Sequence, residues 1–270
     1  MNKEQLIERI EQIPKFVLRD AAVKDEEIVQ FGPKDNFGKD RWVEAENWKA
    51  VTEEGNTIPL AFVSKSYSLV QFDDVFKKLI DNIPELEGYC IYYNGIGLMD
   101  VFPDDEKLKV NGGDRIGMVA LNSVNRTTSV IIKFCVKHGD KIITVPKNIA
   151  GFKRMHMGKA VQITQNFLTV VGKVREIWKT ILTEFEKIKV NETYVIGMMD
   201  SVQIKDNYLR KKVIKKVLDT YDMDLWDTFL YMIDIIESRS FKSDVHRRKK
   251  LDKISELMFK WAVMSRLINA

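Results

Sequence analysis

Residues 115–159 read RIGMVALNSVNRTTSVIIKFCVKHGDKIITVPKNIAGFKRMHMGK, and this stretch decides the fold class. Two strongly apolar segments are joined by the polar turn NSVNRT at 122–127. A third, KIITV at 141–145, follows the tight turn HGD. Asn, Ser and Gly are the residues that such turns favour. The stretch therefore predicts three neighbouring strands, after which a basic run begins.

The elements on either side of this stretch differ in kind. Upstream, the pattern predicts a short helix, short extended runs, a second helix and a hairpin, and downstream it predicts only helices. Strands followed by helices are typical of the α+β class: an antiparallel or mixed sheet packed with helices, followed by a C-terminal helical block. The expected ranges are a helix at 2–13, strands within 27–70, a helix at 71–83, a hairpin at 88–102, and helices at 149–189, 205–220, 225–238 and 245–269.

The domain organisation follows from a boundary near KVNET, at about residue 190. It predicts a mixed α+β nucleic-acid-binding domain over 1–190 and a helical block over 191–270, either separate or packed on the first as one domain. No run approaches the roughly 18 apolar residues that span a bilayer, and the polar start resembles no signal peptide. We therefore expect no membrane association and a cytoplasmic location, the host cytoplasm if the chain is viral. The two cysteines, Cys90 and Cys135, lie in apolar contexts and are expected to be buried reduced thiols.

The net charge of +4 conceals a segregation along the chain. Residues 1–110 hold 14 Lys and Arg against 22 Asp and Glu, and residues 111–270 hold 29 against 17. Such an asymmetry indicates a polyanion-binding half. The alternative is that a lysine-rich composition simply produces helices with solvated faces.

A basic run with interleaved aromatic residues supplies the candidate binding site. Phosphates reward clustered cations through counterion release, and aromatic or His side chains stack bases in single-strand binders. The alternative is that Phe152 and Met155 pack a helix among solvated lysines. The expected phosphate contacts are Lys147, Lys153, Arg154 and Lys159, the expected stacking residues are Phe152 and His156, and Arg126 is expected at the end of the sheet.

Three further features carry a weaker signal. Asn122 and Ser123 end a strand, where amides contact phosphates or simply form a turn. RRKK at 247–250 is a second basic cluster, either a clamp on nucleic acid or a solvated helix face. LRKKVIKK at 209–216 predicts an amphipathic helix that packs against a partner.

The sequence offers little to the enzyme classes. Asp104, Asp105, Glu106 and Lys107 are consecutive, whereas a magnesium site needs carboxylates that converge from separate positions. There is no Walker lysine, no nucleophile elbow and no zinc-type Cys/His spacing. We expect no catalytic residues, no metal and no cofactor.

Several segments resemble a phage- and plasmid-associated domain-of-unknown-function family, number 932. YSLVQFDDVFKKLID at 67–81 is similar to its Tyr-hydrophobic-Val-Gln start, and VALNSVNRTTSVIIKF to its strand ending in Asn-Ser. Asn148, Phe152 and His156 match later motif positions, whereas Pro146 replaces the family's cysteine. LWDTFLYMIDIIESRS at 225–240 is similar to its Leu-Trp helix but lacks the Asn-Ala pair. The resemblance implies a mobile-element origin without a settled activity, and the architecture is reminiscent of ring-forming phage single-strand annealing proteins.

Together these features predict a protein of a virus or plasmid that binds single-stranded DNA or RNA. The expected role is annealing, recombination or protection of DNA, as a homo-oligomer. One alternative is a metal-dependent nuclease or other DNA-processing enzyme. A second is an interaction protein that inhibits a host defence system.

Overall fold

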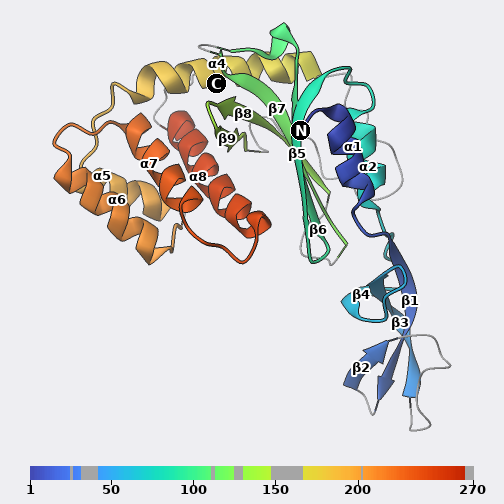
Figure 1. The fold of residues 1–270 in the computed structure, drawn as a ribbon. Coiled ribbons are helices and arrows are strands. Elements are labelled where there is room, and N and C mark those ends of the chain that lie inside the picture. The colour runs from blue at the N-terminus through green and yellow to red at the C-terminus, as the bar shows by residue number, and fades with distance from the viewer. Residues whose placement is uncertain are drawn as a thin grey trace. The chain divides into compact units, whose positions relative to one another are not determined.

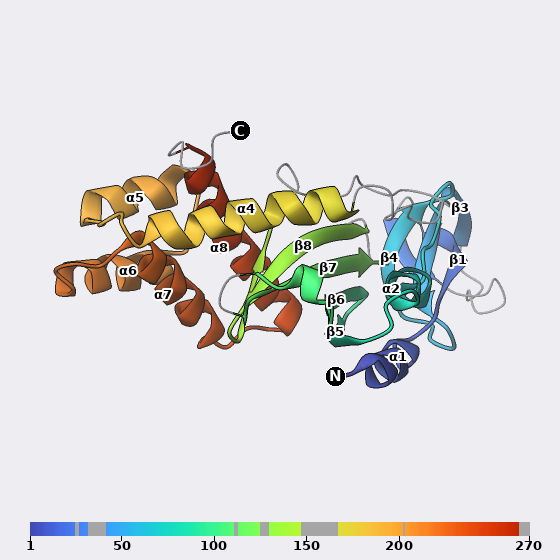
Figure 2. The same ribbon diagram turned by 90° about the horizontal axis from the view of Figure 1, so that it is seen from above.

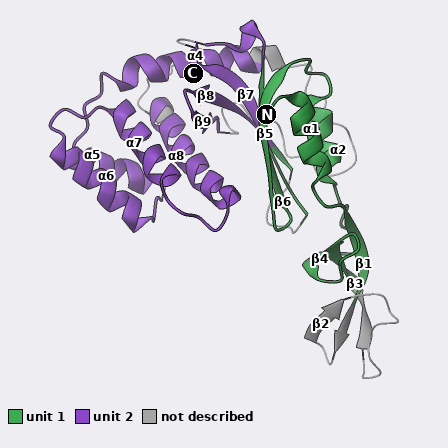
Figure 3. Cartoon of the chain, in the orientation of Figure 1, with its two compact units in different colours: residues 1–103, 120–131, 154–161 green, residues 104–119, 132–153, 162–270 purple. Residues whose placement is uncertain are grey.

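The computed structural model describes residues 1–24, 27–31, 42–110, 113–124, 130–146, 167–201 and 203–264. Within these ranges the chain forms two β-sheets and a C-terminal helical block, so the predicted α+β class is confirmed (Figure 1). Contacts divide the chain into two compact units, coloured in Figure 3. Unit 1 is Met1–Pro103, Ala120–Ile131 and Arg154–Val161, and unit 2 is Asp104–Val119, Ile132–Lys153 and Gln162–Ala270. This partition differs from the predicted boundary at residue 190, which stays a prediction.

Unit 1 begins with a short helix and a four-stranded sheet. The helix α1 starts with a capping box in which Asn2 and Gln5 satisfy each other's backbone amides, and its buried side includes Leu6 and Ile10. The sheet has the order β2-β1-β3-β4, and all three of its strand pairs are antiparallel. The elements are α1 (Lys3–Glu11), β1 (Phe16–Lys24), β2 (Glu27–Phe31), β3 (Trp42–Glu53) and β4 (Pro59–Ser64).

The rest of unit 1 is built around α2 (Phe72–Ile80) and the hairpin of β5 (Leu86–Tyr93) and β6 (Ile96–Pro103). The turn of the hairpin uses Asn94 and Gly95, both at positive φ, which is the backbone that a tight hairpin turn requires. Gly97 is needed for packing, because a Cβ there would lie 2.5 Å from the Phe72 ring. The apolar face of α2 therefore packs against β6.

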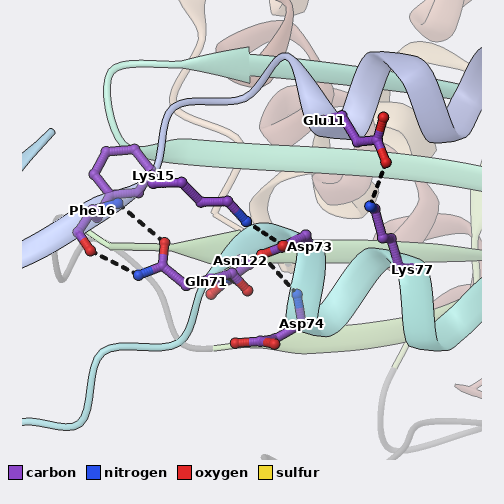
Figure 4. A network of polar contacts seen from close by, with 8 residues as sticks. All are labelled: Glu11, Lys15, Phe16, Gln71, Asp73, Asp74, Lys77 and Asn122. Atoms are coloured by element: carbon purple, nitrogen blue, oxygen red, sulfur yellow. Dashed lines mark hydrogen bonds and ion pairs between the residues drawn. The ribbon is translucent and has the colours of Figure 1, made fainter. Parts of the chain in front are cut away.

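A network of polar contacts ties the start of α2 to the start of β1 (Figure 4). The Gln71 side chain donates to the carbonyl of Phe16 at 2.7 Å and accepts from its amide at 3.1 Å. Lys77 pairs with Glu11 of α1 at 2.6 Å, and Lys15 pairs with Asp73. These contacts satisfy the backbone groups of Phe16 and pair the charge of Lys15 in the segment that joins α1 to β1.

The second sheet has the order β5-β6-β7-β8-β9. After β6 come the 3-10 turn η2 (Glu106–Leu108), β7 (Arg115–Ser123), β8 (Ile131–His138) and β9 (Lys141–Thr144). β8 and β9 are antiparallel and are joined by the predicted turn, in which Gly139 has positive φ. The three strands expected from the central stretch are therefore present.

The helical block of unit 2 follows (Figure 2). Within it α5 packs on α6, α6 on α7, α7 on α8, and α8 on β9. Polar contacts fix this packing, since Asp252 of α8 accepts from the Thr144 hydroxyl at 2.8 Å and Lys141 pairs with Asp234 of α7 at 2.6 Å. The helices are α4 (Phe167–Phe185), α5 (Glu192–Ser201), α6 (Asn207–Asp219), α7 (Leu225–Glu237) and α8 (Asp244–Met264).

Two elements were not predicted. β1 lacks a clear alternation because Arg19 and Asp20 interrupt its apolar residues, yet it is an interior strand of its sheet. α5 has the run Tyr194-Val195-Ile196, which covers more than one helix face and so hides the helical period. The amide of Tyr194 is capped by the Asn191 side chain at 2.9 Å, a helix-start signal that the sequence does contain.

Both cysteines are buried and form no disulfide, as expected. Burial raises the pKa of the Cys90 thiol to about 12, so this residue is an inert core side chain.

Many apolar residues of the helical block are buried within the chain itself. Val213, Val217, Leu225, Trp226 and Phe229 are all buried. Homo-oligomerisation therefore stays a prediction.

Candidate nucleic-acid interface

The residues predicted to bind nucleic acid lie outside the described part of the chain. Their roles in phosphate contact and base stacking therefore stay predictions. They are Arg126, Lys147, Phe152, Lys153, Arg154, His156 and Lys159.

Asn122, at the end of β7, has an internal role. Its side chain is 1% exposed, its amide nitrogen donates to the carbonyl of Val70 at 3.1 Å, and its oxygen accepts from the amide of Ser123 at 2.8 Å. The side chain appears beside Gln71 in Figure 4. Of the two interpretations of the Asn-Ser pair, the structure supports local turn and packing chemistry.

The basic cluster at 247–250 splits into two kinds of residue in α8. Arg248 is buried and lies 3.5 Å from Asp252, and Arg247 pairs with Asp244 at 2.6 Å. Lys249 and Lys250 are exposed. Half of the cluster therefore stabilises the helix, and only the lysines remain on the surface.

The helix α6 has a buried apolar side and an exposed cationic side. Asp206 caps it by accepting the Leu209 amide at 3.1 Å, and Leu209, Val213 and Val217 recur at helical spacing on its buried side. Four lysines are exposed on the other side. We call these lysines, Lys211, Lys212, Lys215 and Lys216, the α6 lysine face.

The α6 lysine face lacks carboxylate partners among the residues that the structure describes. Elsewhere in unit 2, Lys133, Lys141 and Lys189 each lie within 3.3 Å of a carboxylate oxygen. Within the described ranges, no carboxylate lies within ion-pairing distance of any lysine of the α6 lysine face. Four neighbouring uncompensated cations attract a polyanion more strongly than scattered or paired lysines do.

An exposed aromatic ring adjoins these lysines. Tyr208, in the first turn of α6, is 50% exposed. The guanidinium of Arg239 lies 4.9 Å from the centre of the Tyr208 ring, and the ammonium of Lys212 lies 5.7 Å from it. Cations over an aromatic ring hold its orientation, so Tyr208 is a positioned surface ring.

A cavity of about 360 Å³ opens beside the start of α6, between the α5–α6 connection, α7 and α8. Its cations are Lys205, Lys250 and Lys253, and its carboxylate is Asp206, which accepts from Arg239 at 2.8 Å. Partial burial raises the pKa of Asp206, but hydrogen bonds from the Leu209 amide and Arg239 outweigh it. The pKa of this carboxyl therefore lies below its ordinary value, and the group is ionised at neutral pH.

Another polar cluster of unit 2 pairs the buried Asp114 with the half-buried His138. His138, at the end of β8, places Nδ1 2.9 and 3.0 Å from the two oxygens of Asp114, which also accepts from the Trp178 indole at 2.7 Å. The ring of Trp226 meets the His138 ring edge to face, at 5.2 Å between centres. A carboxylate on Nδ1 fixes the tautomer and leaves Nε2 as a proton acceptor. The contacts also join β8, α4 and α7, which is a packing role.

Sequence reasoning did not identify this pair or the cavity. His138 is 24 residues from Asp114, and no local pattern links a turn histidine to a distant carboxylate. The run LRKKVIKK was predicted only as an amphipathic helix that packs against a partner, although it already contained the separation of charged and apolar positions. Tyr208 was not singled out.

Within the described ranges, no group of three or more His, Cys, Asp or Glu side chains has the geometry to hold a metal ion. No helix found there combines the length and apolar character required to cross a bilayer.

Comparisons with known proteins do not place this chain in a family. No protein-family model, no curated protein and no solved structure matches it significantly. The resemblance to the phage and plasmid family is neither supported nor contradicted by this outcome, and the properties of this chain must be argued from its own residues.

Proposed function

We propose that this chain binds single-stranded nucleic acid and that unit 2 supplies one contact surface, made of the α6 lysine face and Tyr208. The observation that carries the proposal is a group of four exposed lysines, with no carboxylate partner in the described part of the chain, next to an oriented, half-exposed aromatic ring. Lysine ammonium groups contact the phosphates along a nucleic-acid backbone, and every base has a face that stacks on an aromatic ring.

Two features favour a single strand over a duplex. Tyr208 presents a ring, and a base can stack on it only if the base is not enclosed in a double helix. The lysines also carry compact charges on flexible stems, which suit a backbone of variable path. Annealing, recombination and protection of DNA in a virus or plasmid are compatible with this activity and are part of the proposal.

The predicted run at 147–159 is a second proposed contact. The two surfaces make separable predictions because different residues carry them. Lys153, Arg154 and Lys159 belong to the run at 147–159, and Lys211 and Lys215 belong to the α6 lysine face.

The test is fluorescence anisotropy with a labelled single-stranded oligonucleotide at several salt concentrations. Changing the four lysines of the α6 lysine face to Gln should weaken binding and flatten the slope of log K against log salt by about 2.8, that is, about 0.7 per contact. The matched control changes four exposed lysines elsewhere, Lys65, Lys78, Lys107 and Lys187, to Gln and has the same net charge.

Three outcomes are decisive. Loss of affinity in the α6 variant alone supports the proposal. Equal loss in both variants shows that only net charge matters, which contradicts a defined site on α6. Absence of binding by the unmodified protein at low salt overturns nucleic-acid binding and favours an interaction protein instead.

A further inference from the structure

The cavity beside α6 has a two-part lining that suits an amphiphilic anion. Its floor is apolar, since Ile204, Leu209, Ile236 and Ile254 line it and each is at most 6% exposed. Its polar residues are three lysines, Asp206 and Gln203. A purely polar ligand would leave this floor uncovered, and an uncharged apolar ligand would leave the lysines unpaired.

The charged residues that line the cavity give it a net positive charge. Lys205 and Lys253 have no carboxylate partner in the described ranges, and Lys250 lies 3.6 Å from Asp206. Asp206 is already engaged, because it caps α6 and accepts from Arg239. Three lysines and one carboxylate make the lining doubly positive, so it complements a doubly negative group.

The size and charge select a class of ligand. A volume of about 360 Å³ is at the small end of small-molecule sites, which begin near 300 Å³. A phosphate monoester carries a charge of about −1.5 to −2 at neutral pH and has three strong acceptor oxygens. A phosphodiester within a strand carries only about one negative charge and must leave the cavity on both sides.

We propose that this cavity binds a nucleotide phosphate monoester, with the phosphate at Lys205, Lys250 and Lys253 and the sugar and base over the apolar floor. This inference rests on the proposed function, because the natural source of the group is then the phosphorylated end of a bound single strand. Tyr208 is linked to the cavity through Arg239, which contacts both Asp206 and the Tyr208 ring. The next base of the strand stacks on Tyr208.

The experiment compares oligonucleotides of one sequence with a 5′-phosphate, a 3′-phosphate or hydroxyl ends, and adds a nucleoside monophosphate as competitor. The unmodified protein should bind one phosphorylated strand about tenfold more tightly than the hydroxyl strand, as expected for one additional charge-assisted contact set. The double variant Lys205→Gln/Lys253→Gln should lose this preference. The matched control Lys242→Gln/Lys249→Gln, which changes two exposed lysines outside the cavity, should keep it.

The outcomes separate this inference from the proposed function. Equal binding of all three strands, with no competition by the monophosphate, overturns the cavity assignment and leaves strand binding intact. A preference that survives in the cavity variant also overturns it. Cavity-dependent binding of the monophosphate with no binding of any strand supports the cavity, identifies a free nucleotide as its ligand, and overturns the proposed function instead.

Discussion

Unit 1 has a polar network that joins α2 to α1 and to the start of β1, here called the α1–α2 junction. This junction and the α6 surface of unit 2 use polar side chains in opposite ways. At the junction, Gln71 bonds both backbone groups of Phe16, and Lys77 pairs with Glu11. On α6, Lys211 and Lys215 are exposed without a carboxylate partner in the described ranges. Polar groups that have internal partners stabilise the fold, whereas polar groups without them remain available to a ligand. The predictions below test this distinction.

The largest expected effect concerns Asp114, a buried carboxylate that two side chains contact. Asp114→Ala leaves the buried Trp178 indole and the half-buried His138 Nδ1 without their acceptor, and should lower the free energy of unfolding by about 3 kcal/mol. Urea denaturation measures this loss. Asp140→Ala, at an exposed position on the β8–β9 turn, is the control and should change stability by about 0.5 kcal/mol or less. A loss below about 1 kcal/mol for Asp114→Ala would contradict a structural role.

The junction itself is tested by Gln71→Ala. Two backbone groups of Phe16 lose their partners, so the free energy of unfolding should fall by about 2 kcal/mol. Lys78→Ala, at an exposed position on the same helix, is the control and should be nearly neutral. If the two variants unfold at the same denaturant concentration, the polar network of Figure 4 does not stabilise the junction.

Substitutions on the α6 surface should alter the affinity for single strands and leave the free energy of unfolding nearly unchanged. Tyr208→Ala should weaken single-strand binding by about tenfold, because base stacking on an aromatic ring contributes about 1–3 kcal/mol. Tyr208→Phe keeps the ring and should bind like the unmodified protein. Equal affinity of the Ala and Phe variants in anisotropy titrations would remove stacking from the account.

The smallest effect concerns Asp206, which has internal partners and also lines the proposed binding cavity. Asp206→Asn keeps a helix cap but removes the charge that Arg239 contacts, at an expected cost of about 1 kcal/mol at neutral pH. Because the pKa of Asp206 is lowered in the folded state, its contribution is complete above the unfolded pKa of roughly 4 and is lost as the pH falls through the folded pKa. The difference in stability between protein and variant should therefore shrink from about pH 5 to about pH 2. A difference that stays constant with pH would show that the charge does not matter.

Local patterns in the sequence determined much of this protein. Alternation and turn residues predicted the strands of the central stretch, and apolar spacing predicted α2, α6, α7 and α8, because these elements each bury one face. The same patterning separated the lysines of α6 from its core residues. Local reasoning failed for β1 and α5, whose apolar residues do not follow a single period.

Only the tertiary structure decided how distant polar groups combine. Asp114 reaches His138 and Trp178, and Lys205 shares a cavity with Lys250 and Lys253, from which it is 45 and 48 residues away in the chain. The sequence shows which residues are charged, but hydrogen bonding and burial depend on which segments pack together. Those contacts set apart the buried Arg248 from the exposed Lys249 beside it, because packing of α8 covers one side chain and leaves the other in solvent.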